Sequence, residues 1–232
     1  MGAVKEFSQH RLRDIQRHIE RAHIQPFDMM VAGVTGAGKS TTLNSLFGRS
    51  VATVGYGVDP ETMEITSYSL NDYFRIWDTP GLGDGVQKDQ LHKRAMTELL
   101  YRSYENNGET YGFIDMVLVI IEGAKRDMGS TYTLLNEVIV PNIQRDRIFV
   151  AINQADVAMK GGHWNREFNR PDASLEQYLK DQTDSVRRRV QEATGIQIYQ
   201  PVAYSAEYGY NVEKLYDLII DHMPFEKRRF MS

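Results

Sequence analysis

Residues 33–40 combine the residue types and the spacing that bind phosphate. Their sequence, Gly-Val-Thr-Gly-Ala-Gly-Lys-Ser, fits the pattern G-x-x-x-x-G-K-[ST]. In this pattern the backbone N–H groups form a concave anion site, the lysine reaches the terminal phosphates of a nucleotide, and the serine hydroxyl ligates Mg²⁺. The sequence therefore predicts a site for a nucleoside triphosphate.

The segments on either side of this loop support the prediction. Residues 27–32 form a short apolar run typical of a buried strand, and residues 40–47 place Leu43 and Leu46 on one helical face before Gly48. The order strand, glycine loop, helix is the context in which the pattern binds phosphate, because the helix N-terminus adds partial positive charge. A glycine-rich turn without a ligand is the alternative, and the flanking segments argue against it.

Beyond this unit, predicted strands alternate with predicted helices. We expect strands at residues 61–70, 73–78, 115–122, 147–153 and 199–204, and helices at residues 87–106, 131–140, 174–193 and 211–222. The first two of these strands form a hairpin, and the next two are continuous apolar runs typical of strands buried in a parallel sheet. The alternation predicts an α/β fold with helices on both faces of the sheet.

The composition is that of an ordinary globular protein. The 232 residues are 41% hydrophobic and carry a formal net charge of −4, so charge does not indicate nucleic acid as a partner. The chain has no cysteine, which excludes disulfides and thiolate metal sites and is compatible with a reducing cytoplasm. No segment approaches the roughly 18 apolar residues of a membrane-spanning helix, and we expect a cytoplasmic protein.

The first 25 residues precede the phosphate-binding unit. From about residue 6 to residue 22, apolar residues recur at helical spacing with arginines between them, which predicts an amphipathic helix. We expect residues 1–25 to be packed on, or appended to, a nucleotide-binding domain of residues 26–232. Packing on the domain is the favoured interpretation, and contact with a partner or an anionic membrane is the alternative, since a basic amphipathic helix serves either.

Chemically suggestive residues also follow the predicted strand that ends at Asp78. In open α/β sheets, ligands bind at the carboxyl ends of the strands. A carboxylate there can organise Mg²⁺ opposite the hydroxyl of Ser40, and the N–H of Gly81 can bind a γ-phosphate. The structural alternative is that Asp78 caps a turn and that Gly81 supplies a positive φ after Pro80.

Two later strands are followed by groups that suit a guanine base. Asp156, in the run Asn-Gln-Ala-Asp at residues 153–156, can accept two hydrogen bonds from N1 and N2 of guanine. Adenine supplies no such pair, so ATP would leave buried acceptors unpaired. After the third buried strand, the N–H of Ala206 can donate to guanine O6. Together these residues predict selection of guanine nucleotides.

These segments resemble, in order and spacing, the signatures of the GTPase superfamily: GxxxxGK[ST], a switch threonine, DxxG, [NT]KxD and SA. The run Asp-Thr-Pro-Gly-Leu-Gly-Asp at residues 78–84 is most similar to the translation-factor-related class of P-loop GTPases, in particular the Era-like, septin-like, prophage-associated and 50S-ribosome-binding types. The resemblance implies a three-layer P-loop fold, whose six-stranded, mostly parallel sheet has one antiparallel edge strand. It also implies Mg²⁺, GTP or GDP as ligand, and GTP hydrolysis in a switch cycle.

The resemblance assigns roles to individual residues. Those expected to bind nucleotide are Gly36, Ala37, Gly38, Lys39, Ser40, Thr41, Asn153, Gln154, Asp156, Ser205 and Ala206. Those expected to hold Mg²⁺ are Ser40, Thr62 and Asp78, and those expected to act in catalysis are Lys39, Thr62 and Gly81. Thr62 and Thr66 both lie in the interval of the switch threonine, and Thr62 is favoured because Thr66 lies within a predicted strand.

Three residues depart from the family pattern. Gln154 replaces the usual lysine over the base, Gly36 stands where potassium-activated relatives have asparagine, and Leu82 occupies the place of the water-positioning glutamine of Ras-type proteins. An alkyl side chain cannot orient a water molecule, so we expect slow hydrolysis unless an activating protein or a second copy supplies the missing group. A septin-like assembly module with negligible turnover is the alternative function.

Other residues gave weaker signals. The six histidines show no zinc-like spacing, and we expect them to be solvated or core residues. Trp164 lies in a polar loop predicted at residues 158–172, where it either contacts a partner or anchors the loop.

Overall fold

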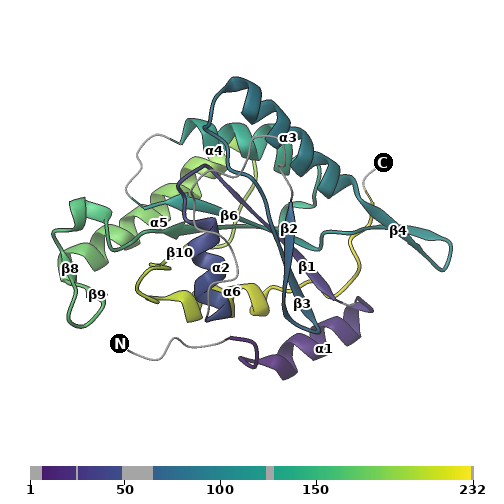
Figure 1. The fold of residues 1–232 in the computed structure, drawn as a ribbon, viewed down its shortest axis with the longest axis horizontal. Coiled ribbons are helices and arrows are strands. Elements are labelled where there is room, and N and C mark those ends of the chain that lie inside the picture. Colours follow the sequence, from purple (N-terminus) through teal and green to yellow (C-terminus); the bar gives the residue numbers. More distant parts are fainter. Residues whose placement is uncertain (1–6, 25, 49–64, 124–127, 231–232) are drawn as a thin grey trace.

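The central sheet has six strands in the order β10-β7-β6-β1-β3-β2 (Figure 1). The computed structural model describes residues 7–24, 26–48, 65–123 and 128–230. The strands are β1 (Phe27–Gly33), β2 (Thr66–Asn71), β3 (Phe74–Asp78), β6 (Met116–Glu122), β7 (Ile148–Asn153) and β10 (Val202–Ala203). All neighbouring strands pair in parallel except β2 with β3. The predicted α/β fold, with one antiparallel edge strand, is confirmed.

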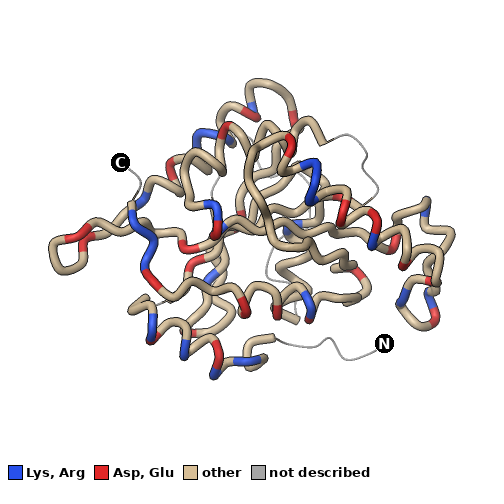
Figure 2. The backbone as a smooth tube through the Cα atoms, turned by 180° about the vertical axis from the view of Figure 1, so that it is seen from behind, with Lys and Arg blue, Asp and Glu red and all other residues tan. Residues whose placement is uncertain are grey.

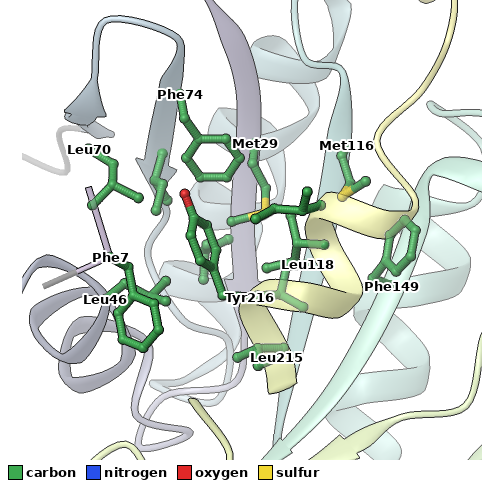
Figure 3. Packing of buried hydrophobic residues seen from close by; sticks show 14 of the residues in the cluster. Phe7, Met29, Leu46, Leu70, Phe74, Met116, Leu118, Phe149, Leu215 and Tyr216 are labelled. Carbon is green, nitrogen blue, oxygen red and sulfur yellow. The ribbon is translucent and has the colours of Figure 1, made fainter. Parts of the chain in front are cut away.

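Helices cover both faces of this sheet. They are α1 (Leu12–Ala22), α2 (Lys39–Phe47), α3 (Val86–Tyr101), α4 (Gly129–Leu134), which continues as a π-helical turn at Leu135–Ile139, α5 (Ala173–Thr194) and α6 (Val212–Asp221). Because side chains alternate along a strand, Met29 of β1 packs with α1, α2 and α6, whereas Met30 packs with α3, α4 and α5. Figure 3 shows part of the first of these two cores, in which Leu46 of α2 lies beside Phe7 and Met29 of β1 lies beside Phe74. The result is three layers.

Helix α1 packs on the face formed by α2 and α6. Ile15 and Ile19 are 0% and 3% exposed and belong to the core of that face. At its start, Arg11 forms ion pairs with Asp217 at 3.3 Å and Asp221 at 2.6 Å, both on α6. The apolar stripe is therefore covered by the rest of the chain, as the packing interpretation expects. Basic and acidic residues alternate along the helix (Figure 2).

Among the described helices, none combines the length and the apolar character needed to cross a membrane.

The sequence interpretation was wrong in the region after α3. The helix predicted at residues 87–106 ends at Tyr101, and a hairpin of β4 (Ser103–Asn106) and β5 (Glu109–Gly112) follows. The turn of this hairpin is Asn107-Gly108, with φ of 53° and 79°. A two-residue hairpin turn of this type needs positive φ at both positions, which asparagine and glycine tolerate best. The predicted helix thus included the first strand of this hairpin.

The predicted polar loop at residues 158–172 also contains regular structure. It includes a short 3₁₀ helix (Ala158–Gly161) and two paired strands, β8 (Trp164–Asn165) and β9 (Arg170–Pro171). A second 3₁₀ helix (Arg145–Arg147) precedes β7. At the sheet edge beside β7, the strand predicted at residues 199–204 is reduced to β10. Strands of two residues are too short to show an alternating pattern.

Candidate nucleotide-binding site

The phosphate-binding loop connects β1 to α2 at the carboxyl edge of the sheet. Gly36 and Gly38 have φ of 86° and 83°, in the left-handed region that side chains with a Cβ disfavour. The Nζ of Lys39 donates to the carbonyl oxygens of Gly33 and Val34, each at 3.2 Å, and so folds back over the loop. Burial lowers the pKa of Lys39, and the negative charges of Asp78 and Asp84 oppose this effect. Ser40 and Thr41 follow in the first turn of α2.

Asp78 ends β3 beside Val31 of β1, its partner in the parallel register, and so lies next to this loop. Burial raises the pKa of its carboxyl group, while the charge of Lys39 and a hydrogen bond from Ser40 act in the opposite direction. Its Oδ1 is buried and has no hydrogen-bond partner among the described residues. A buried unpaired carboxylate oxygen beside a serine hydroxyl is a donor set that suits Mg²⁺.

The loop after Asp78 lies directly against the phosphate-binding loop. Thr35 N donates to the Leu82 carbonyl oxygen at 2.7 Å, and Thr35 Oγ1 donates to Asp84 Oδ2 at 3.0 Å. A Cβ added to Gly81 would lie 2.6 Å from Thr35 N. The glycine is therefore required by close approach, and the alternative that Gly81 supplies a positive φ is wrong, since its φ is outside that region.

Leu82 points away from this contact into the protein. Its side chain is 1% exposed and belongs to the core formed by α3, where Met96 and Leu99 also lie. The sequence interpretation considered only the chemistry of the leucine side chain, and the structure adds that this position is a core position.

Asn153 joins the two ends of the site. Its Nδ2 donates to the carbonyl oxygen of Ala37 at 3.0 Å, and its Oδ1 accepts from the N–H of Ala206 at 3.0 Å. Gln154, at a φ of 63°, donates through Nε2 to the carbonyl oxygen of Gly36 at 2.8 Å. The side chains of the last residue of β7 and of the residue after it thus both contact the phosphate-binding loop.

Asp156 and Ser205 form the far end of the site. Ser205 Oγ donates to Asp156 Oδ1 at 2.5 Å and accepts from the N–H of Tyr208 at 3.3 Å. The ring of Trp164 lies against those of Tyr208 and Tyr210, with centroid distances of 5.5 and 5.4 Å. Trp164 is 8% exposed and anchors the β8–β9 lobe on the loop that carries Ser205, which supports the anchoring interpretation.

The structure brings the sequence-predicted residues that it describes together at one edge of the sheet. Thr62 lies outside the described residues, and Thr66 is an exposed residue of β2 that pairs in register with Asp78. Sequence reasoning missed His92 of α3, whose Nδ1 donates to the carbonyl oxygen of Gly81 at 2.5 Å. The available signal was its spacing of four residues from the buried Met96, which places both on the inner face of the helix.

Comparison with known proteins finds septins that are similar to part of this chain. Septin-8 of Xenopus tropicalis is 30% identical over 87 residues, which are 34% of this chain and 20% of the septin. The septin homolog spn1 of Schizosaccharomyces pombe is 30% identical over 88 residues, 32% of this chain and 19% of that protein. The matches thus span about a fifth of the length of these relatives.

Two solved structures share the fold. Toc33 from Arabidopsis thaliana, in complex with GDP and Mg²⁺, has a TM-score of 0.65 at 16% identity and covers 97% of this chain and 96% of its own. Era from Aquifex aeolicus, bound to GDP·AlF₄⁻, has a TM-score of 0.56 at 19% identity and covers 87% of this chain and 58% of its own. The family model described as 50S ribosome-binding GTPase matches residues 28–186, which include the phosphate-binding loop, Asp78, Gly81 and Asp156. The chain therefore belongs to the 50S ribosome-binding GTPase family.

Proposed function

We propose that this protein binds GTP and GDP together with Mg²⁺, hydrolyses GTP slowly unless it is assisted, and acts as a molecular switch. The observation that carries the proposal is the pair of hydrogen bonds made by Asn153, which join Ala37 of the phosphate-binding loop to Ala206. This bridge supports the proposal, because Ala37 is expected to bind the phosphates and Ala206 is expected to bind the guanine base. The same proposal includes a nucleotide-binding domain of residues 26–232, a switch cycle between its GTP and GDP forms, and a location in the cytoplasm.

In this proposal the phosphates lie on the loop and the base lies beyond it. The backbone N–H groups of residues 36–41 and the Nζ of Lys39 bind the phosphates, with Lys39 exchanging its bonds to Gly33 and Val34 for the nucleotide. Asp156 accepts from guanine N1 and N2, and the Ala206 N–H donates to O6. Gln154, which contacts the loop at Gly36, lies beside the base in place of the usual lysine.

The residues present also fit the metal ion that such a nucleotide carries. Ser40 and Asp78 would hold Mg²⁺, and Thr62 is the proposed third ligand. When bound, the ion supplies positive charge to the phosphate oxygens. The unpaired, buried Oδ1 of Asp78 supports this assignment, because a buried carboxylate oxygen without a partner is costly unless a ligand satisfies it.

Slow hydrolysis follows from the position of Leu82. The side chain that would correspond to a water-positioning glutamine is an alkyl group, and it is buried in the core. A nucleotide-dependent homodimer or an activating protein would then complete the reaction. The same observation favours a second candidate function, a septin-like assembly module in which the nucleotide holds an interface and turnover is negligible.

Calorimetry with GTP, GDP and ATP tests the proposed ligand. We expect GTP and GDP to bind, ATP to bind poorly, and the Lys39→Ala variant to lose nucleotide binding, with Lys180→Ala on the exposed side of α5 as the matched control. Asp156→Asn should shift the preference toward xanthosine nucleotides, whose C2 oxygen accepts where guanine donates. Equal affinities for ATP and GTP would refute the guanine assignment.

Phosphate release measured at increasing protein concentration separates the two candidate functions. Slow release per molecule at low concentration supports the switch, and activity that rises more steeply than concentration indicates assistance by a second copy. No release at any concentration, with GTP still bound, would favour the assembly module.

A further inference from the structure

His92 is a buried histidine on α3 that contacts the loop proposed to face the phosphates. Its side chain is 4% exposed, and its Nδ1 lies 2.5 Å from the carbonyl oxygen of Gly81. A carbonyl oxygen can only accept, so the proton of this hydrogen bond belongs to Nδ1. The first turns of α3 are thereby joined to the glycine whose N–H we have assigned to the γ-phosphate.

Two neighbours constrain Gly81. Thr35 of the phosphate-binding loop leaves no room for a Cβ, which would lie 2.6 Å from its N and 2.7 Å from its Cα. His92 holds the carbonyl oxygen from the side of α3. A larger residue at position 81 would therefore clash with Thr35, and the carbonyl of Gly81 cannot turn without breaking the bond to His92. A peptide fixed in this way costs less entropy when a ligand binds to it than a peptide that must first be ordered.

The neighbouring hydrogen bonds restrain other parts of the loop. Asp89 of α3 accepts from the N–H groups of Gly83 at 2.8 Å and Asp84 at 3.2 Å, and these bonds are exposed. Thr35 N donates to the carbonyl oxygen of Leu82. Among the described residues, His92 is the side chain bonded to the carbonyl of Gly81. Water can replace the exposed hydrogen bonds of Asp89 when they are lost, but it cannot reach the buried bond between His92 and Gly81.

We propose that His92 is a positioning residue for the triphosphate: its Nδ1–H holds the carbonyl of the peptide that follows Gly81, which restrains the residue whose N–H we assign to the γ-phosphate. This inference rests on the proposed function. Because GDP has no γ-phosphate, the contribution of His92 is specific to GTP. The side chain does not touch the nucleotide, and it acts through Gly81.

Affinities for GDP and for a non-hydrolysable GTP analogue, both with Mg²⁺, test this role in the full chain. We expect His92→Leu to weaken the analogue by about five- to tenfold, the effect of one buried hydrogen bond, and to leave the GDP affinity within about twofold of the wild type. His92→Asn should restore most of the loss, because its amide nitrogen occupies the place of Nδ1. The kcat of GTP hydrolysis should follow the same order.

Two further variants make the experiment decisive. His222→Leu removes a hydrogen bond of the same kind, from Nδ1 to the carbonyl oxygen of Leu218 at 2.9 Å, and should change neither affinity. If His92→Leu does not fold, His92→Gln replaces it, since its amide nitrogen lies one bond too far from the backbone to reproduce Nδ1.

Equal losses for GDP and the analogue, or no rescue by His92→Asn, would overturn the inference and leave His92 a structural residue. Tighter binding of the analogue by His92→Leu would also overturn it, because the bond to Gly81 would then oppose the GTP state. A wild-type protein that binds no guanine nucleotide would instead refute the proposed function, so the two failures are distinguishable.

Discussion

The bridge made by Asn153 gives a prediction about stability that needs no nucleotide. Asn153 is 2% exposed, and its amide makes two buried hydrogen bonds, one to each side of the site. In Asn153→Ala, the carbonyl of Ala37 and the N–H of Ala206 lose these partners. Each buried group left unsatisfied costs about 1–3 kcal/mol, so we expect the free energy of unfolding to fall by about 2–5 kcal/mol.

Urea denaturation of the nucleotide-free protein measures this change, because a bound ligand would add its own contribution to the native state. The matched control is Asn165→Ala. The Oδ1 of Asn165 accepts from the N–H groups of Glu167 and Phe168, both at 3.0 Å, but these bonds are exposed. Water replaces such bonds, so the control should lose less than about 1 kcal/mol. A loss in Asn153→Ala no larger than in the control would refute the reasoning.

Asn153→Asp separates the donor from the acceptor. The introduced carboxylate still accepts from the N–H of Ala206, but its second oxygen faces the carbonyl oxygen of Ala37 where the amide had donated. Repulsion between these oxygens raises the folded-state pKa of the new carboxyl above its unfolded value of about 3.9. The variant should therefore lose stability as the pH rises from about 4 to neutral, and should approach the wild type below pH ~4. Wild-type stability at neutral pH would contradict the assigned geometry.

Two further predictions concern other buried groups. Burial raises the pKa of Asp115 to about 7, while its Oδ2 accepts from the N–H of Asp28 at 2.9 Å. Because the folded-state pKa lies above the unfolded value, this carboxyl makes the free energy of unfolding fall as the pH rises from about 4 to about 7. Urea unfolding of Asp115→Asn should show a smaller decline over that range. The same decline in the variant and the wild type would contradict this. Trp164→Ala should cost about 3–5 kcal/mol and weaken GDP binding, since the ring supports Tyr208 and Tyr210. Trp164→Phe should cost less, because it keeps an aromatic ring and Nε1 has no hydrogen-bond partner among the described residues. Thermal unfolding followed by circular dichroism measures both losses. Equal losses for the two variants would argue against ring packing as the cause.

Local sequence signals predicted the phosphate-binding unit well. About twenty residues contain the glycines Gly36 and Gly38, the apolar run before them and the helical face after them. The sequence was therefore enough to place β1, the loop and α2. The end of α3 was missed because the residues after Tyr101 lack a strong pattern of either kind. There the decisive signal was the turn chemistry of Asn107-Gly108.

Long-range contacts account for what the sequence did not predict. The hydrogen bond from His92 to Gly81 joins a helix to a loop eleven residues earlier, and no spacing rule distinguishes it from an ordinary core position. The contacts of Asn153 with Ala37 and Ala206 link segments more than fifty residues apart. The choice between Thr62 and Thr66 stays a prediction, since Thr62 lies outside the described residues.

The burial of Leu82 changes the argument about hydrolysis. From the sequence, the residue was an alkyl side chain at a place where Ras-type proteins carry a glutamine. In the structure its backbone contacts Thr35, whereas its side chain packs beside Met96 and Leu99. A glutamine at this position would have to bury an unpaired amide in that core or unfold the loop to reach the phosphates, and either costs free energy. The leucine at position 82 and the inward direction of its side chain thus belong to one arrangement, in which the leucine anchors the loop. Under the proposed function, a water-orienting group would then come from outside this loop.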